Sequence, residues 1–440
     1  MSQFSTILKF LSLSILAGIP SGQAIDILNV PGSDGTPFFQ LYLYNPGEHP
    51  EAAPEKDGSD FTLNDREKAA IIDGLSYWAS ILTPKAKNQA PLNIAIVTEG
   101  EYDGNASATS DYLPNGYTML SSALTGNPPL GDPELDGALA LITVDHAQYF
   151  NGEWNTSPMP SFPENGEKAN LPSILVHEMM HALGLVCDTD ANSDNTLFSF
   201  TGKSLWNAGL RDIYGHAAQD GMIITEKGSK EDDGTAFVTN GKSSHVGVYF
   251  TGNHVEEVLQ GALLAWPDDS TENRVAGLPV NGWEENEFGC SNPEFSHIEL
   301  QNSLMSHQDY RNWNILMEAE LAVMQDCGLE LDRRNFYGNS LYNDGLTYIN
   351  KNPYYARNAE GTGWKEGQYN PTTYGTGFHV YGSHNTIRQT ADLLSSGKWG
   401  IGIRMDGSGN TLTIDPNVRV HANGTEGNAL LVAYGRNHHV

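Results

Sequence analysis

One short motif occurs three times near the C-terminal end of this 440-residue chain. Its copies are Gly382-Ser383-His384-Asn385-Thr386-Ile387, Gly407-Ser408-Gly409-Asn410-Thr411-Leu412 and the shorter Tyr434-Gly435-Arg436-Asn437. The asparagines recur after 25 and then 27 residues (Asn385, Asn410, Asn437), a period typical of solenoids. Because such repeats bury their apolar faces only by stacking, we predict an all-β solenoid, the start of a β-helix, over residues 333–440. The three asparagines should then occupy equivalent turns.

The residues before this solenoid are expected to form a separate unit, because single cores seldom grow beyond about 250–300 residues. Asn64 and Glu67 form an Asn-x-x-Glu capping pattern, which predicts the start of an amphipathic helix. Short apolar strands bounded by turn residues are predicted at 93–97 and 138–144. We therefore predict an α+β domain over residues 25–332.

Two more helices are predicted within this domain. The first begins at Pro172 and ends at Gly184, since proline suits a first helical turn and glycine suits a left-handed C-terminal turn. The second spans residues 312–327, with a glycine after it as its stop. The stretch 188–289 is rich in Gly, Asn, Asp and Ser, and we interpret it as a long insertion with little regular structure.

The first 24 residues have the features of a signal peptide. Lys9 precedes the apolar stretch Phe10 to Ile19, and the ending Gly22-Gln23-Ala24 resembles a signal-peptidase site. We predict that residues 1–24 are removed and that the mature protein is secreted or lies at the cell surface. No later apolar run reaches transmembrane length, so no membrane-spanning helix is expected in the mature chain.

The chain is strongly acidic, with 54 Asp and Glu residues against 24 Lys and Arg and a formal net charge of −30. Such a charge repels nucleic acid and anionic lipid, so partners of these two classes are not expected. It agrees both with an acidic surface that keeps the protein in solution and with calcium binding by some carboxylates.

The residues His177-Glu178-Met179-Met180-His181 form the motif H-E-x-x-H. On a helix the two histidines lie at i and i+4 on one face, so both imidazoles can reach one ion. Zinc accepts nitrogen ligands and tolerates an open position for water. The motif therefore predicts a Zn²⁺ site held by His177 and His181, with Glu178 as the general base of a hydrolase.

With Gly184 included, the sequence reads H-E-x-x-H-x-x-G and resembles the metzincin peptidases, in which the chain turns at this glycine and then supplies a third ligand. In the commonest pattern that ligand lies three residues after the glycine. This chain has Cys187 there, followed by Asp188. Either residue, or a glutamate elsewhere in the chain, is a possible third ligand.

A downstream segment offers a further third ligand. Residues 295–307 are similar to the leishmanolysin-like branch, in which a large insertion precedes the third histidine and a Met-turn follows it. The resemblance implies that His297 is the third zinc ligand and that Met305 packs beneath the metal without binding it. His307 or Tyr310, shortly afterwards, could stabilise the developing oxyanion.

The cysteines and an acidic loop allow two smaller predictions. Only three cysteines occur, so at most one bridge can form within the chain, and we favour Cys187 with Cys290. The alternating Asp188, Asp190, Asn192 and Asp194 imitate the start of an EF-hand loop but lack its glycine and closing glutamate. A solvated acidic loop is the simpler interpretation there, and Ca²⁺ binding is the alternative.

The segment Asp332 to Gly338 and the Gly-Ser-x-Asn-Thr turns after it are similar to passenger regions of bacterial autotransporters. Together with the metzincin resemblance, this implies a zinc metalloendopeptidase exported to the exterior of a Gram-negative outer membrane, with proteins or peptides as substrates. The alternative is a surface adhesin with a structural, non-catalytic peptidase-like domain, in which the solenoid does the binding. Intact His177, Glu178 and His181 favour the enzyme.

Overall fold

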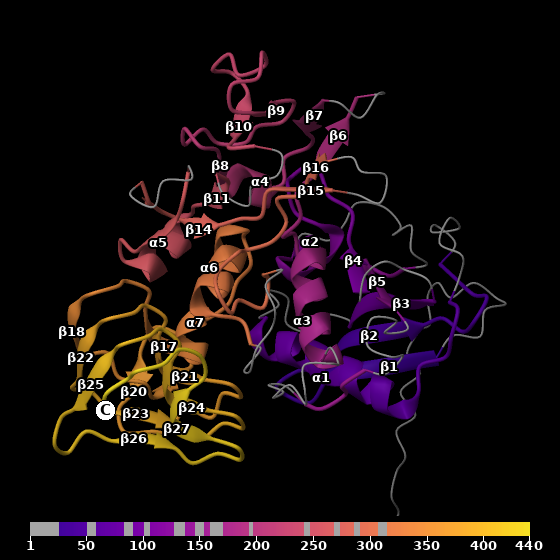
Figure 1. Cartoon of the computed structure of the whole chain (residues 1–440). Coiled ribbons are helices and arrows are strands. Elements are labelled where there is room, and N and C mark those ends of the chain that lie inside the picture. The colour runs from indigo at the N-terminus through magenta and orange to yellow at the C-terminus, as the bar shows by residue number, and fades with distance from the viewer. Residues whose placement is uncertain are drawn as a thin grey trace, which may run out of the picture.

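The computed structural model describes most of the chain, namely residues 26–50, 59–82, 91–100, 106–126, 137–145, 154–158, 170–192, 197–241, 247–267, 273–285, 291–306 and 315–440. The predicted signal peptide lies outside these stretches. Figure 1 shows an N-terminal sheet with its helices, a middle region of short elements, and stacked C-terminal strands in yellow. Within the described stretches, no helix combines the length and the apolar character needed to cross a membrane.

The N-terminal sheet has five strands in the order β1-β2-β3-β5-β4. Its strands are β1 (Asp26–Pro31), β2 (Pro37–Leu43), β3 (Leu92–Glu99), β4 (Ala106–Thr109) and β5 (Ala140–Asp145). The inner strands β2, β3 and β5 are parallel, whereas β1 and β4 run antiparallel to their neighbours. The strands predicted at 93–97 and 138–144 correspond to β3 and β5. Among the described strands, this order makes β4 an edge strand.

Helices α1 (Asp65–Ile81), α2 (Met119–Leu124) and α3 (Leu171–Ala182) accompany this sheet. The predicted start of α1 is confirmed: the Asn64 side chain accepts the Glu67 main-chain N–H, and the Glu67 carboxylate accepts that of Asn64. Helix α1 packs tightly on α3, because a Cβ at Gly74 would come within 2.6 Å of the Pro172 carbonyl oxygen. The buried indole N–H of Trp78 also donates to the Val176 carbonyl at 2.9 Å. The two helices are thereby held in a fixed register.

The prediction of little regular structure in residues 188–289 is wrong. The described residues of that stretch form helices α4 (Leu205–Gly209) and α5 (Asn253–Leu259) and ten short strands: β6 (Thr189–Ala191), β7 (Phe198–Phe200), β8 (Leu210–Arg211), β9 (Ile223–Glu226), β10 (Phe237–Thr239), β11 (Tyr249–Phe250), β12 (Leu263–Ala265), β13 (Val275–Ala276), β14 (Leu278–Pro279) and β15 (Trp283–Glu285). Buried aromatic side chains stabilise it, as in the stacking of Trp206 on Phe250 at 4.7 Å. These strands have two to four residues each, too few for a periodic pattern to reveal them.

Strand β16 (Ser291–Pro293) leads to helices α6 (Glu318–Asp326) and α7 (Arg333–Phe336). The helix predicted over 312–327 is therefore shorter in its described part: residues 315–317 are not helical, and 312–314 lie outside the described residues. Helix α6 starts at Glu318 because the Glu320 carboxylate accepts the Met317 main-chain N–H from within the first turn. A side chain thus caps the helix at that point.

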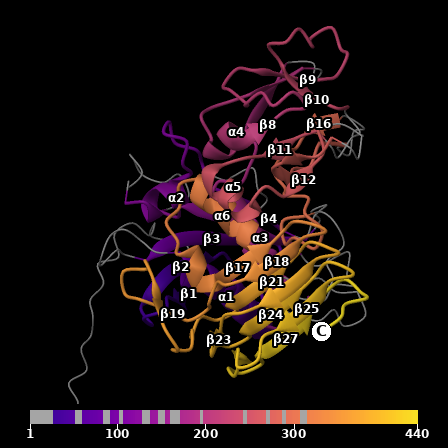
Figure 2. The same ribbon diagram turned by 90° about the vertical axis from the view of Figure 1, so that its left-hand side faces the viewer.

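The C-terminal residues wind into successive coils of short strands (Figure 2). Parallel pairing builds three stacks, in the orders β17-β21-β24-β27, β18-β22-β25 and β23-β26, and β19-β20 forms an antiparallel hairpin. The strands are β17 (Tyr337–Leu341), β18 (Thr347–Asn350), β19 (Ala356–Arg357), β20 (Trp364–Lys365), β21 (Thr376–Val380), β22 (Thr386–Gln389), β23 (Leu393–Ser395), β24 (Ile401–Met405), β25 (Thr411–Ile414), β26 (Val420–Ala422) and β27 (Asn428–Val432).

The repeated asparagines form a ladder between coils. Asn385 donates its main-chain N–H to the Asn410 side chain at 2.8 Å, and each side-chain amide donates to a carbonyl of the preceding coil. Asn437 departs from the predicted equivalence: Thr411 pairs with both Thr386 and His439, so Asn437 lies one position before the ladder. There it has a φ of +59°, like His384 in the first repeat. The third repeat thus uses its asparagine for a left-handed turn.

The coils share a hydrophobic core with the helices that precede them. One buried cluster runs from the N-terminal sheet through α3 and α6 to Tyr337, Tyr342 and Tyr374 of the coils. The Tyr374 ring meets Tyr77 of α1 edge-on at 5.4 Å. The Tyr342 hydroxyl oxygen accepts the Ala319 main-chain N–H at 3.0 Å. The coils therefore pack directly against the helices.

A buried ion cluster lies in the coils beside this shared core. Arg404 and Asp406 are joined at 2.7 Å, and the His379 imidazole lies 2.8 Å from the same carboxylate. Burial alone would raise the pKa of Asp406, but the charge of Arg404 and the contact with His379 lower it to about 2. The native state therefore favours the ionised carboxylate.

We expect Asp406→Asn to lower the free energy of unfolding by about 3–5 kcal/mol, since it leaves the Arg404 charge buried without a full counter-charge. Asp415→Asn is the matched control: Asp415 also pairs with an arginine on the coils, but the Arg388 side chain is 58% exposed, so a loss below about 1 kcal/mol is expected. Urea unfolding of both variants gives the comparison.

The stability of the parent protein should also depend on pH. Because the Asp406 pKa falls from 3.8 to about 2 on folding, the ionised carboxylate contributes about 2 kcal/mol to the free energy of unfolding above pH 4, and this contribution disappears as the pH falls towards 2. Equal losses of unfolding free energy in Asp406→Asn and Asp415→Asn would contradict a stabilising role for the buried Arg404–Asp406 pair.

Candidate metal centre

Three histidine side chains converge beside helix α3. His177 and His181 lie one turn apart on α3, and His297 comes from the segment after β16. The candidate ligand atoms of the three all lie within 4.8 Å of one another, and the His297 ring centroid is 5.2 Å and 4.9 Å from the other two. In the described part of the chain, no other group of three His, Cys, Asp or Glu side chains is gathered in this way.

The hydrogen bonds of the helical histidines determine which ring nitrogen carries a proton. His177 Nδ1 lies 2.8 Å from the Leu304 carbonyl oxygen, and His181 Nδ1 lies 2.7 Å from that of Leu185. A carbonyl oxygen only accepts, so Nδ1 of each ring must be the donor. In both neutral rings, Nε2 therefore carries a lone pair.

These two lone pairs face each other, because the Nε2 atoms of His177 and His181 are 3.1 Å apart. While both rings are neutral, neither can donate a hydrogen bond there, and a cation between the nitrogens would stabilise the arrangement. Two ligands of a tetrahedral ion at about 2.0–2.1 Å are roughly 3.3 Å apart, close to the spacing found. The donor set of three imidazoles thus fits zinc.

The turn after α3 is fixed by residues that the motif does not include. Gly184 has a φ of +114°, which permits the left-handed turn expected from the sequence. The Tyr112 hydroxyl donates to the carbonyl oxygens of Gly184 and Val186 at 2.9 Å and 3.0 Å. The Thr118 hydroxyl donates to the Ala182 carbonyl at 2.8 Å. These contacts position the segment whose Leu185 carbonyl orients His181.

A second turn, at residues 303–305, orients His177 and depends on Glu320 of α6. The Ser303 hydroxyl and the Met305 main-chain N–H both donate to Glu320 Oε1, at 2.6 Å and 3.1 Å. The turn then presents the Leu304 carbonyl to His177. Met305 is fully buried at this turn. Sequence reasoning gave neither Glu320 nor Tyr112 this supporting role, because no spacing pattern indicates it.

His297 is held by its main chain and by a nearby carboxylate. Its N–H donates to the Asn281 side-chain oxygen at 3.0 Å, and its Nδ1 lies 3.8 Å from a Glu294 carboxylate oxygen. Asn281 precedes β15 (Trp283–Glu285) and Glu294 follows β16, which pairs with β15. The hairpin in this part of the middle region therefore carries His297 to α3.

Glu178 follows His177 on α3 and is not one of the three converging side chains. Only 7% of its surface is exposed, and burial raises the pKa of its carboxyl to about 8, although the Ala108 main-chain N–H of β4 donates to it and opposes the rise. A cation held by the histidines would lower this pKa again. The carboxyl thus contacts the edge strand β4.

Cys187 and Asp188 are not among the three converging side chains. The Cys187 thiol is free, so the bridge predicted with Cys290 is not formed in the structure, and Cys290 lies outside the described residues. The Cys187 main-chain N–H instead donates to the Ser296 hydroxyl oxygen at 3.0 Å. A hydrogen bond thus joins the two segments that the disulfide was expected to link.

The predicted oxyanion residues and part of the predicted acidic loop lie outside the described residues. His307 and Tyr310, proposed for the oxyanion, lie outside the described residues, as does Asp194 of the acidic loop. Asp190 lies in β6, which pairs antiparallel with β7. The described start of that loop is therefore a hairpin, and Ca²⁺ binding there stays a prediction.

Comparisons with protein-family models, with curated proteins and with solved structures find no match to this chain.

We expect Glu320→Gln to weaken both stability and metal retention. One carboxylate oxygen accepts from Ser303 and Met305 and the other from Met317, so the amide nitrogen of glutamine must oppose an N–H or O–H donor. The loss should be about 1–3 kcal/mol for an unsatisfied buried group, with a several-fold faster release of zinc to a chelator. Glu360→Gln, on an exposed turn of the coils, is the control. Unchanged zinc release in the Glu320 variant would show that the turn does not depend on this carboxylate.

Proposed function

We propose that the chain is a zinc-dependent endopeptidase resembling the metzincins, with His177, His181 and His297 as ligands and Glu178 as general base. The observation that carries the proposal is the convergence of the three histidines, with the Nε2 atoms of His177 and His181 3.1 Å apart and Nδ1 of each of these two rings beside a carbonyl oxygen. Imidazoles that are oriented by second hydrogen bonds are typical of zinc ligands.

The chemistry follows from the residues around the cluster. Zinc, when bound, supplies a Lewis acid that polarises a carbonyl oxygen and makes water more acidic. The Glu178 carboxylate accepts one proton from the attacking water while the water oxygen bonds to the peptide carbonyl carbon. The carboxyl then gives that proton to the leaving amine as the C–N bond breaks.

The edge strand β4 is a reason to expect a polypeptide as the substrate. It pairs with β5 on one side, and its Ala108 N–H points towards Glu178 on the other. An extended peptide can add to such an edge by main-chain hydrogen bonds. A peptide bound in this way would have its scissile bond near Glu178, and this binding requires no particular side chain in the substrate.

Export of the chain and its place in an autotransporter-type passenger remain part of the proposal, based on the N-terminal sequence and the C-terminal repeats. The adhesin is the competing function. It predicts bound zinc without cleavage of any protein, whereas the peptidase predicts both.

Metal removal provides the decisive experiment. The purified protein should contain one zinc per chain and should cleave members of a denatured protein library, with products identified by mass spectrometry. A strong chelator should abolish cleavage, and added zinc should restore it. Cleavage that survives complete zinc removal would refute the proposal, and zinc without any cleavage would favour the adhesin.

A further inference from the structure

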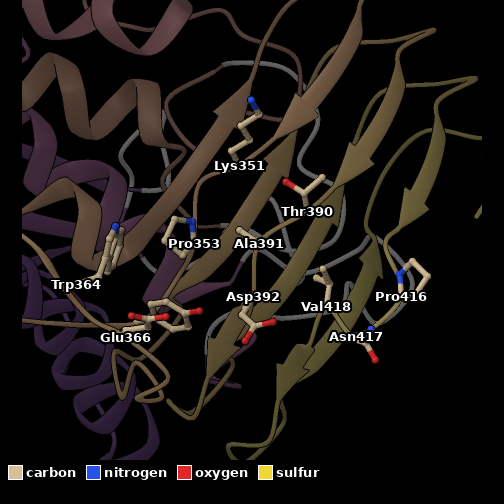
Figure 3. Close-up of a pocket in the computed structure, with 11 residues that line it drawn as sticks. Lys351, Pro353, Trp364, Glu366, Thr390, Ala391, Asp392, Pro416, Asn417 and Val418 are labelled. Atoms are coloured by element: carbon tan, nitrogen blue, oxygen red, sulfur yellow. The ribbon is translucent and has the colours of Figure 1, made fainter.

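A hollow of about 620 Å³ lies on the side of the coils, and Figure 3 shows the residues that line it. It crosses three successive turns of the chain, around Pro353, Ala391 and Asn417. The turns stack in register, since Tyr354 pairs with Leu393 and Leu393 with Val420. The hollow is therefore a groove along the axis of the coils. None of its lining residues belongs to the histidine cluster.

The main chain beneath this groove is already hydrogen-bonded between coils. The Tyr354 N–H donates to the Asp392 carbonyl at 2.9 Å, and the Leu393 N–H donates to the Arg419 carbonyl at 2.8 Å. These bonds run from coil to coil, so the groove offers side chains and no open strand edge. An extended peptide, which binds largely through main-chain hydrogen bonds, therefore has little to pair with here.

Contacts with neighbouring side chains hold Trp364, in the apolar part of the groove, in place. Trp364 belongs to the β19-β20 hairpin, where Arg357 lies over its ring at 4.6 Å and Tyr354 meets it edge-on at 5.8 Å. Arg357 is itself anchored by Asp332 at 2.7 Å. Tyr355 and two prolines add further flat apolar surface. Aromatic surfaces held in place in this way can bind the C–H faces of sugar rings at little entropic cost.

The polar part of the groove is balanced in charge. Asp392 accepts from Arg419 at 2.8 Å and from the Tyr355 hydroxyl, while Lys351 and Glu366 have no ion pair within the described part of the chain. Lys351 therefore offsets the charge of Glu366, and Arg419, which lies outside the lining, offsets that of Asp392. Carboxylates accept strong hydrogen bonds from hydroxyl groups, and Thr390 and Asn417 add neutral partners.

We propose that this groove binds a neutral oligosaccharide lying along the axis of the coils. Flat apolar surface beside carboxylate and amide groups fits the two faces of a sugar ring, and the balanced local charge gives no advantage to an anionic ligand. The net charge of −30 further disfavours acidic polysaccharides. The groove would hold the protein on a glycan surface independently of any peptidase activity.

The test uses the full-length protein and a panel of neutral oligosaccharides, namely malto-, cello-, xylo- and chito-oligosaccharides, in calorimetric titrations. At least one should bind, and Trp364→Ala and Glu366→Ala should each weaken it at least fivefold. Glu366 is exposed, so its variant should fold even if the tryptophan variant does not. Glu360→Ala, an exposed change outside the groove lining, is the matched control and should bind as the parent does.

Three results would overturn the proposal. One is the absence of binding by every neutral sugar. Another is binding that survives both groove substitutions. The third is selective binding of an acidic oligogalacturonide or of an extended peptide, tested in parallel. Peptidase activity should be unchanged in both groove variants, so failure of this proposal and failure of the peptidase proposal give different results.

Discussion

A Glu178→Gln variant is expected to retain one zinc per chain while its kcat/KM for peptide cleavage falls by about 10²–10⁴-fold, the range for loss of a general base. Glutamine fills the same buried space and can still accept the Ala108 N–H, so the fold should be preserved. None of the three histidines is changed, so metal content should stay the same. Metal analysis and cleavage rates of the same sample measure both effects.

Glu360→Gln serves as the control for this change, because Glu360 is exposed and far along the chain from the histidines. Near-parental turnover by the Glu178 variant, once contaminating peptidase is excluded by a chelated sample, would rule out Glu178 as the base. Loss of zinc together with activity would instead assign Glu178 a structural role at the metal.

Replacing His297 by Ala is expected to weaken zinc binding by more than 100-fold, since loss of a direct ligand should exceed the 10–100-fold typical of its outer partners. Activity should fall with the metal. Competition with a chromogenic chelator gives the affinity. The effect should exceed that of Asp188→Ala and Cys187→Ala, because neither side chain belongs to the converging group.

The comparison among these three variants tests the third-ligand assignment directly. If Asp188→Ala or Cys187→Ala releases zinc while His297→Ala retains it, the leishmanolysin-like placement fails. Thermal unfolding of each zinc-free protein separates a loss of ligand from a loss of fold, because ligand loss alone leaves the zinc-free transition close to that of the parent.

Local patterns predicted the parts of the site that are close in sequence. Asn64 and Glu67 define the start of α1 because both capping partners lie within one turn. His177 and His181 share a face of α3 for the same reason of spacing. Where both interacting residues lie within about one helical turn, the sequence alone predicts how they are arranged.

The remaining parts of the site depend on contacts between distant segments. His297 lies 116 positions after His181, and only the family resemblance pointed to it. Glu320 supports the turn at Met305 from across the core, and Tyr112 holds the chain after Gly184. A buried glutamate or tyrosine has no sequence signature of this role, because its partners are main-chain groups that any residue could provide.

The same limit explains the errors in the fold. The middle region is built from strands of two to four residues whose stability comes from aromatic packing rather than from periodicity. In the coils, Asn385 and Asn410 share a ladder position while Asn437 is displaced by one residue. The identity of the repeated letters suggested an equivalence that the backbone register does not follow.

The core shared by the helices and the coils has a consequence for how this protein can be divided. Tyr342 bonds to the first turn of α6, and Glu320 in that turn supports the loop that orients His177. Cutting the chain near residue 332 would expose the apolar face of α6 to water and leave the loop without its backing. A truncated N-terminal fragment would then be a poor zinc binder and prone to aggregation. Calorimetry of the whole chain should accordingly show a single cooperative melting transition, because the coils stabilise the helix that supports the metal site.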